Sequence, residues 1–216
     1  MRYPLGIQTF ENIRTDGYLY MDKTALVYEL AKGGKYCFLS RPRRFGKSLL
    51  ISTLEAYFQG KRELFCGLAI SQMEQEWKQY PVLHIDLNAE KFTTPEALNN
   101  LLDNHLCEWE ELYGKGAGEN TLSTRFKGII RRACEQTGQK VVILVDEYDK
   151  PLLQSIGNKA LQDDYRATLK AFYGVEKSMD GYIQFGFFTG VTKFSKVSVF
   201  SELNNLTDIT MIRSTA

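Results

Sequence analysis

The sequence predicts an α/β fold in which a mainly parallel, five-stranded sheet lies between two layers of helices. Short apolar runs rich in β-branched and aromatic residues alternate with longer segments of helical periodicity. The run at 140–146 is continuously apolar, which is typical of a central parallel strand covered on both faces. Strands that alternate with helices pair in parallel, and 216 residues suffice for one core. We therefore expect a single three-layer domain over residues 1–216.

Each expected strand is short and is bounded by polar or turn-forming residues. Residues 1–34 form an N-terminal segment that leads into the first strand, and the last strand is expected at the edge of the sheet. The five strands are KYCFLS at 35–40, VLHIDL at 82–87, KVVILVD at 140–146, YIQFGFFTG at 182–190 and LTDITMI at 206–212.

Four segments between the strands have the apolar spacing of amphipathic helices. Thr94 before Pro95 suits an N-cap followed by the first helical residue. Gly138 suits the end of the third helix, because glycine readily adopts the left-handed conformation found there. The four helices are expected at 47–58, 95–113, 123–137 and 160–178.

The composition is that of an ordinary globular protein, with 44% hydrophobic and 25% charged residues. A formal net charge of +1 gives no general argument for binding nucleic acid or membranes. The sequence has no apolar run of membrane-spanning length and no signal-peptide core, so we expect a cytoplasmic protein without membrane contact. Its four cysteines and two histidines are too scattered for a zinc site.

The segment RPRRFGKS at 41–48 nearly fits the phosphate-loop pattern G-x-x-x-x-G-K-[ST], with Arg41 in place of the first glycine. A strand is expected before it and a helix after it, and a helix N-terminus binds phosphate through its unpaired N–H groups. Lys47 would reach the terminal phosphates and Ser48 would bind Mg²⁺. The alternative is a basic turn that caps the strand. The nucleotide contacts expected here are Arg41, Pro42, Arg43, Arg44, Phe45, Gly46, Lys47, Ser48 and Leu49.

The segment VVILVDEYDKPL at 141–152 is typical of a Walker B element, because its apolar strand ends in Asp146 and Glu147. Asp146 would hold Mg²⁺, directly or through water, and Glu147 would orient and polarise an attacking water molecule. We expect structural roles for the following Asp149 and Lys150. The alternative is an acidic loop after a core strand.

The end of the fourth expected strand carries a candidate phosphate sensor. In sheets of this type a polar residue at that position contacts the terminal phosphate, and Thr189 is the first candidate, with Thr192 second. A threonine that ends a strand is also an ordinary turn residue. The sequence does not single out an arginine finger: Arg166 and Arg213 are both available, and without a finger we expect slow turnover.

Four blocks of the sequence together resemble the bacterial AAA-ATPase-like family. The resemblance extends from about Pro4 to Thr210, and it implies a P-loop ATPase fold of the additional-strand class. In that class the fourth strand lies between the phosphate-loop strand and the Walker B strand. The blocks are YLYMDKTALVYEL, FLSRPRRFGKSLLISTLEAYFQGKRELFCGLAI, VVILVDEYDKPLL and FFTGVTKFSKVSVFSELNNLTDIT.

The resemblance also implies roles for single residues. The family's own phosphate loop reads RPRRFGKS, so Arg41 is part of the family's version of the loop. Met21-Asp22-Lys23 is similar to the family's V-D-K-T block, and in related ATPases the segment before the first strand lies near the adenine. Asp22 and Lys23 are thereby implied as base-side contacts. The implied ligands are ATP and Mg²⁺; ATP is preferred to GTP through the resemblance alone, and no guanine-specifying N-K-x-D motif is evident.

Members of this family commonly join the ATPase-like domain to a small helical region and a PD-(D/E)XK nuclease-like domain. The printed sequence ends at Ala216, so we expect it to lack the C-terminal lid and the nuclease-like domain. A nucleic-acid or protein partner would act through that C-terminal region. This expectation rests on association with the family and not on a site in these residues.

The leading hypothesis is a P-loop ATPase domain that binds Mg-ATP and hydrolyses it, as the motor or switch part of a larger nuclease-associated protein. The first rival is a nucleotide-binding switch or interaction module with little turnover. The second is a nucleic-acid-binding module that uses Arg41, Arg43 and Arg44, which would show steep salt dependence. A small-molecule kinase would need a substrate pocket that the sequence does not locate. The oligomeric state is left open.

Overall fold

A computed structural model of the chain describes residues 2–192, 199 and 206–210. The described residues form a five-stranded sheet in the order β2-β3-β4-β1-β5, and every neighbouring pair of strands is parallel. This confirms the predicted α/β fold with a P-loop NTPase-like sheet, in which β4 lies between β1 and β3. The strands are β1 (Tyr36–Ser40), β2 (Val82–Asp86), β3 (Val141–Asp146), β4 (Ile183–Gly190) and β5 (Leu206–Asp208).

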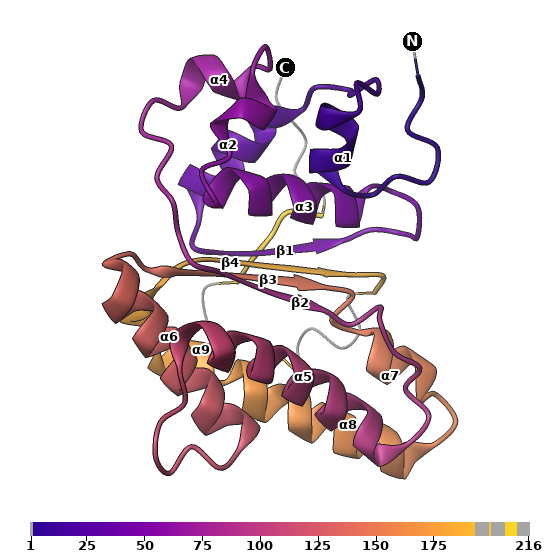
Figure 1. Ribbon diagram of the computed structural model, residues 1–216. Helices are drawn as coiled ribbons and strands as arrows, with labels where there is room; N and C mark the ends of the chain where they lie inside the picture. Colours follow the sequence, from indigo (N-terminus) through magenta and orange to yellow (C-terminus); the bar gives the residue numbers. More distant parts are fainter. Residues whose placement is uncertain (1, 193–198, 200–205, 211–216) are drawn as a thin grey trace.

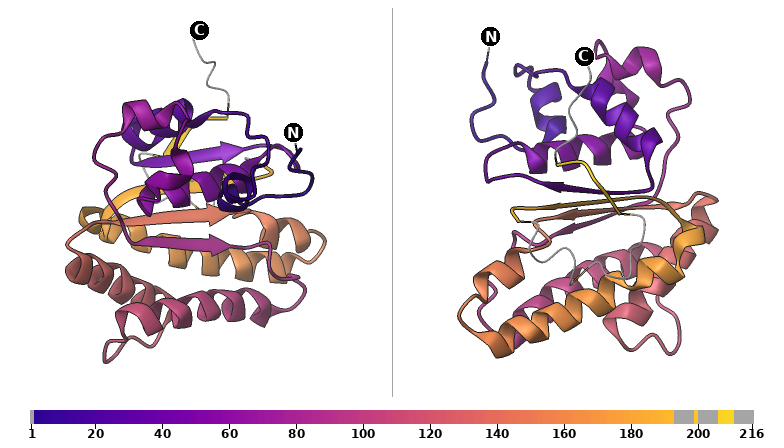
Figure 2. Two further views of the ribbon diagram at one scale, coloured as in Figure 1. Left: turned by 45° about the horizontal axis from the view of Figure 1, so that its top comes forward. Right: turned by 180° about the vertical axis from the view of Figure 1, so that it is seen from behind.

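Helices cover both faces of the sheet and give the molecule three layers (Figure 1, Figure 2). One layer covers one face of the sheet and is built from α1 (Phe10–Thr15), α2 (Thr24–Gly33), α3 (Lys47–Phe58) and α4 (Ile70–Met73). The other layer is built from α5 (Pro95–Tyr113), α6 (Leu122–Thr137), α7 (Lys150–Gln154), α8 (Lys159–Tyr173) and α9 (Val175–Ser178).

The predicted helix at 160–178 is wrong as a single element, because the chain forms α8 and α9 with Gly174 between them. Glycine is among the poorest helix formers, so a continuous helix is weakest at this position. β5 ends at Asp208 and not at 212, although residues 211 and 212 lie outside the described part. Helices α1, α2, α4 and α7 were not predicted, since most of them are too short for a clear periodicity.

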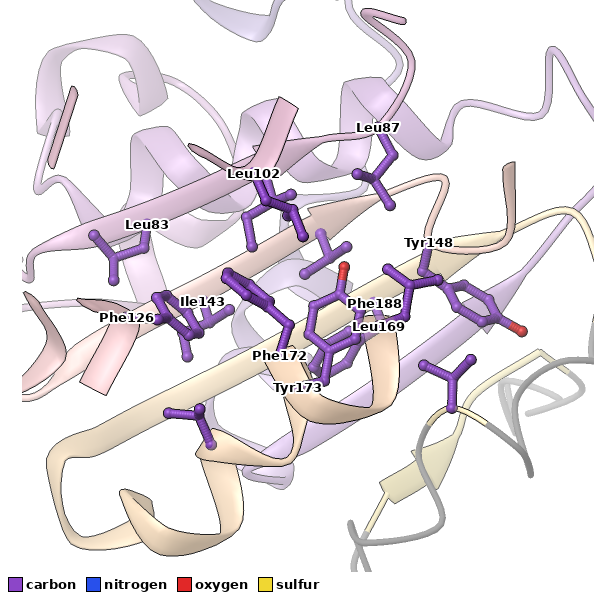
Figure 3. Close-up of a cluster of buried hydrophobic side chains, with 14 of the residues drawn as sticks. Leu83, Leu87, Leu102, Phe126, Ile143, Tyr148, Leu169, Phe172, Tyr173 and Phe188 are labelled. Carbon is purple, nitrogen blue, oxygen red and sulfur yellow. The ribbon is translucent and has the colours of Figure 1, made fainter. Parts of the chain in front are cut away.

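Alternate residues of each inner strand point to opposite faces of the sheet, and this divides the core in two. On the side of α1 to α4, Val142, Leu144, Phe185 and Phe187 pack with residues of α3. On the other side, Ile143 and Phe188 pack with residues of α5, α6 and α8, as Figure 3 shows. Phe126 of α6 and Phe172 of α8 stack there, with their ring centroids 4.5 Å apart.

Edge strand β2 departs from this pattern on the face that α3 covers. Its alternate residues Leu83 and Ile85 are fully buried, whereas His84 and Asp86 on the α3 side are only partly buried. Because all strands are parallel, their carboxyl ends meet at one edge of the sheet. That edge carries the β1–α3 loop and the turns after β3 and β4, so the fold places the candidate motifs together.

Candidate functional site

The loop at 41–46 connects β1 to α3 and has an unusual backbone conformation. Arg44 has a φ of 67° and Gly46 has a φ of 75°, so both adopt the left-handed region. Glycine is suited to this region, whereas an arginine there is uncommon. The N–H of Arg41 donates to the carbonyl oxygen of Gly190 at 3.1 Å, which attaches the start of the loop to the end of β4.

Lys47 is the first residue of α3, and its side chain is buried inside the loop, with 4% exposed. Its Nζ donates to the carbonyl oxygens of Arg41 at 3.0 Å and Pro42 at 3.3 Å. The same Nζ lies 3.0 Å from Oε1 of Glu147. The Lys47 ammonium therefore has three oxygen partners. A phosphate that bound to this ammonium would displace one or more of these oxygens.

The carboxylate of Asp146, at the end of β3, is held from two sides. Oγ of Ser48 donates to its Oδ2 at 2.6 Å, and Oγ1 of Thr189 donates to its Oδ1 at 2.5 Å. The first contact joins the start of α3 to the end of β3, and the second joins the ends of β3 and β4. Two hydroxyl donors thus fix the orientation of a largely buried carboxylate.

Glu147 follows Asp146 in a strained backbone conformation, with a φ of 57°. Its N–H donates to Oγ1 of Thr189 at 3.3 Å, and its side chain turns back to Lys47. Strain of this kind costs about 1–3 kcal/mol and persists only where the surroundings enforce it. Here the hydrogen bond from the Glu147 N–H to Thr189 and the ion pair between the Glu147 side chain and Lys47 supply that enforcement.

The residues present fit a magnesium ion that is shared with a phosphate ligand. Within the described residues, no group of three or more His, Cys, Asp and Glu side chains could hold a metal. The Ser48 hydroxyl and the Asp146 carboxylate nevertheless lie together and are hard oxygen donors. Mg²⁺ commonly binds one or two such protein groups and takes its remaining ligands from water and substrate phosphates.

A cavity of about 1240 Å³ opens beside these groups, between α3, the ends of β2 and β3, and the N-terminal segment. Its lining combines the phosphate-loop residues with both acids of the β3 turn. It includes Leu5, Gly6, Ile7, Gln8, Thr9, Arg43, Arg44, Gly46, Lys47, Ser48, Leu49, Glu55, His84, Asp86, Asp146 and Glu147. The structure therefore brings together most of the residues that the sequence singled out.

Comparisons with known proteins identify the family of this chain. The family described as "Predicted AAA-ATPase" matches residues 4–200, which is more than half of the chain. The chain belongs to this family. An uncharacterized protein in the vnfD 5′ region of Azotobacter chroococcum mcd 1 is 40% identical over 211 residues. That match covers 97% of this chain but only 41% of the relative, and no solved structure matches significantly.

In this AAA-ATPase-like chain, the implied role of Asp22 and Lys23 as base-side contacts stays a prediction. Neither belongs to the described lining of the cavity. Oδ1 of Asp22 instead accepts hydrogen bonds from N and Oγ1 of Thr24, and Oδ2 accepts from the N–H of Ala69. Partial burial alone would raise the pKa of Asp22, but these hydrogen bonds lower it. Asp22 thus connects the start of α2 to the segment before α4.

A different part of the N-terminal segment reaches the cavity, namely Leu5 to Thr9. The N–H of Phe10 donates to Oγ of Ser52, so this segment is attached to the face of α3. The sequence could not reveal this proximity, because the pentapeptide has no recognised motif and its position depends on the packing of α1 on α3.

Four other predicted site residues are not in the described lining of the cavity but adjoin residues that are: Arg41, Pro42, Phe45 and Thr189. Arg41 and Pro42 contribute carbonyl oxygens to Lys47, and Phe45 projects from the loop with 68% of its surface exposed. Thr189 is fully buried and its hydroxyl is engaged with Asp146 and Glu147. Its proposed contact with a terminal phosphate stays a prediction.

Sequence reasoning missed a polar pair in the outer part of the cavity. Nδ1 of His84 lies 3.1 Å from Oε2 of Glu55, which is on α3. Burial alone would lower the pKa of His84, but the hydrogen bond to Glu55 and the charges of Glu55, Asp86 and Asp146 raise it overall. The alternation of His84 and Asp86 on a strand that faces a helix was the available signal, since apolar side chains usually occupy such positions.

Proposed function

We propose that this domain binds a magnesium–nucleoside triphosphate, preferentially ATP, and hydrolyses it. One observation supports this most strongly: Lys47 and Ser48, from one end of α3, contact Glu147 and Asp146, from the end of β3, and all four line one cavity. These are the residue types that phosphoryl transfer needs, because that reaction depends mainly on positioning and charge compensation.

The phosphate loop would bind the triphosphate through its backbone and its basic side chains. The first N–H groups of α3 point away from the helix and favour an anion. Lys47 would leave the carbonyl oxygens of Arg41 and Pro42 and pair with phosphate oxygens. Arg43 and Arg44 line the same cavity and would add positive charge from within the chain.

Ser48 and Asp146 would hold Mg²⁺, which compensates phosphate charge when it is bound. Thr189 would keep the Asp146 carboxylate in place through its 2.5 Å hydrogen bond. Once Lys47 pairs with phosphate, the Glu147 carboxylate loses its ammonium partner and becomes available as a base. It would then orient a water molecule and accept its proton as the water oxygen bonds to the terminal phosphorus. The bond from that phosphorus to the bridging oxygen would break in the same reaction, which releases inorganic phosphate and the nucleoside diphosphate.

We place the base-side contacts at Leu5 to Thr9, in place of Asp22 and Lys23. This segment lines the cavity and is attached to α3 through the Phe10 N–H. The preference for ATP still rests on the family resemblance. The relation to a nuclease-like partner domain is likewise an inference from the family, and the chain spans 41% of the length of its curated relative.

A second candidate is a nucleotide-binding switch with little turnover. The ion pair between Lys47 and Glu147 favours it, because the candidate base is neutralised within the cavity. Arg166 is paired with Asp163, which gives no support to a finger role, and Arg213 lies outside the described residues. A nucleic-acid-binding role for the loop has less support, since Arg43 and Arg44 line the cavity.

Phosphate release from Mg-ATP tests the leading proposal against the switch. The wild-type chain should release phosphate in an Mg²⁺-dependent manner, and Lys47→Ala should abolish this. Binding of an ATP analogue without phosphate release by the wild type would favour the switch. Phosphate release that survives Lys47→Ala unchanged would contradict both candidates, because each uses this loop.

A further inference from the structure

A network of hydrogen bonds joins the turn after β3 to the turn after β4, and Asp149 is at its centre. The Asp149 side chain is 0% exposed. Its two oxygens accept from the N–H of Val191 at 3.1 Å each, and Oδ2 also accepts from N of Thr192 at 2.7 Å and from Oγ1 of Thr192 at 2.9 Å. One carboxylate thereby fixes the first two residues after β4.

Tyr148 strengthens the same junction. Its N–H donates to the carbonyl oxygen of Thr189 at 2.9 Å, and its hydroxyl donates to the carbonyl oxygen of Thr192 at 3.1 Å. A Cβ added to Gly190 would lie 2.5 Å from Cε1 of Tyr148 and 2.8 Å from Oδ1 of Asp149. The end of β4 therefore packs directly against residues 148 and 149, and only glycine fits this approach.

The junction determines where the Thr189 hydroxyl points. Thr189 lies just before Gly190 and Val191, whose positions Tyr148 and Asp149 fix. Its Oγ1 donates to Asp146 and accepts from the N–H of Glu147. A chain of contacts thus leads from Asp149, through the end of β4, back to the two acids that precede it in sequence.

The chemistry of Asp149 suits this role. Its neighbours in the network are two N–H groups and one O–H group, and all three are donors. Both oxygens of an ionised carboxylate are acceptors, so Asp149 can accept a hydrogen bond from each donor. Within the described residues no salt bridge of Asp149 is present, so its charge is balanced by hydrogen bonds. An asparagine with its oxygen at the Oδ2 position would turn its NH₂ group towards the N–H of Val191. Two donors would then face each other, one of the two contacts of that N–H would be lost, and the negative charge would be removed.

We propose that Asp149 is a positioning residue for phosphoryl transfer. It keeps the β4 turn, and with it Thr189, in the arrangement that orients Asp146 for the metal and Glu147 for the attacking water. This inference rests on the proposed hydrolysis of Mg-ATP. It goes beyond a general structural role, because it predicts a loss that is specific to the metal-dependent step.

The decisive variant is Asp149→Asn, and Ser155→Ala is its matched control. Ser155 is also buried and donates to the carbonyl oxygens of Pro151 and Leu152 within α7, and its hydroxyl makes no hydrogen bond to β4 in the described part of the chain. Three quantities are compared with the wild type: ATP-analogue affinity without Mg²⁺, the Mg²⁺ concentration for half-maximal phosphate release, and kcat. Asp149→Asn should lower kcat about tenfold or more and raise the required Mg²⁺, while affinity without Mg²⁺ changes less than about twofold.

Thr192→Val is a milder second variant, which decides the question if Asp149→Asn does not fold. It removes one donor to Asp149, whereas Thr192→Ser keeps that hydroxyl and should lose less activity. An unchanged kcat and Mg²⁺ requirement in both Asp149→Asn and Thr192→Val would overturn the inference, as would an equal loss in Ser155→Ala. Failure of the wild type to bind nucleotide would instead overturn the proposed function.

Discussion

Nζ of Lys47 and Oε1 of Glu147 lie 3.0 Å apart in the buried part of the phosphate-loop cavity. The lysine that would bind phosphate and the acid that would activate water thus neutralise each other. Glu147 also holds a strained backbone conformation beside this contact. In the proposed mechanism, pairing of Lys47 with a phosphate would separate the two side chains, so nucleotide binding would also free the Glu147 carboxylate to act as a base.

Glu147→Gln should raise the affinity for a non-hydrolysable ATP analogue. In this variant Lys47 has no ion pair to break before it pairs with a phosphate. We expect a gain of about three- to tenfold, and tenfold corresponds to about 1.4 kcal/mol. Phosphate release from ATP should fall about 100-fold or more with loss of the base. Titration calorimetry and a phosphate assay measure the two effects. The exposed Glu135→Gln on α6 is the control, and equal affinities for wild type and Glu147→Gln would contradict a competing ion pair.

Ser48→Ala should weaken the Mg²⁺ dependence of nucleotide binding, since it removes one of two adjacent oxygen donors. The expected loss in affinity measured with Mg²⁺ is about 10- to 100-fold, with little change in its absence. Thr53→Ala is a suitable control, because Thr53 is on the same helix and its hydroxyl contacts the carbonyl oxygen of Leu49 and the side chain of Tyr20, which do not belong to the candidate metal site. A similar loss in both variants, or a loss that does not depend on Mg²⁺, would argue against a metal role for Ser48.

The two histidines should titrate on opposite sides of the ordinary histidine pKa. Burial lowers the pKa of His105, whereas Glu55 and the neighbouring acids raise that of His84 despite its burial. Glu55→Gln should lower the pKa of His84 and leave that of His105 nearly unchanged. NMR titration of the ring protons follows both residues in one sample. If His84 titrates identically in wild type and Glu55→Gln, the contact at 3.1 Å does not form in solution.

Glu176 should make the protein less stable as the pH rises. It is fully buried, and neither carboxyl oxygen has a hydrogen-bond partner among the described residues. Burial raises its pKa well above the usual range. Between the pKa of about 4.3 in the unfolded chain and the folded pKa, only the folded state holds the proton. Its contribution to stability is therefore complete below the unfolded pKa and falls by up to about 1.4 kcal/mol per pH unit above it.

Glu176→Gln removes this titration, so urea unfolding of the variant should depend less on pH than that of the wild type. The difference in unfolding free energy should favour the variant more at pH 8 than at pH 5. The exposed Glu135→Gln should keep the wild-type dependence. Parallel curves for wild type and Glu176→Gln would show that the carboxyl of Glu176 is not buried as described.

The sequence predicted those parts of the fold that depend on local pattern. Continuous apolar runs located β3 and β4, and the class implied by the motifs gave the position of β4 between β1 and β3. The single helix at 160–178 was wrong, because the weak point at Gly174 interrupts it without disturbing the apolar spacing on either side. Short helices such as α1 depend on contacts with α3 and have no signal of their own.

Within the candidate site, the predicted residues are those that belong to contiguous motifs. Lys47 and Ser48 meet Asp146 and Glu147 because the parallel direction of β1 and β3 brings the two loops to one sheet edge. The segment that we propose for base-side contacts could not be found in this way. Asp22 is occupied by local hydrogen bonds, and Leu5 to Thr9 reach the cavity only through the packing of the N-terminal segment on α3.

Equilibrium binding of a fluorescent ATP analogue measures whether the loop at 41–48 binds the phosphates of a nucleotide. The wild-type chain should bind the analogue, more tightly with Mg²⁺ than without it. Lys47→Ala should lose this binding, whereas Lys127→Ala, which removes an exposed lysine of α6, should keep it. No binding by the wild type at millimolar nucleotide, or equal binding by Lys47→Ala and Lys127→Ala, would show that this loop does not bind the phosphates.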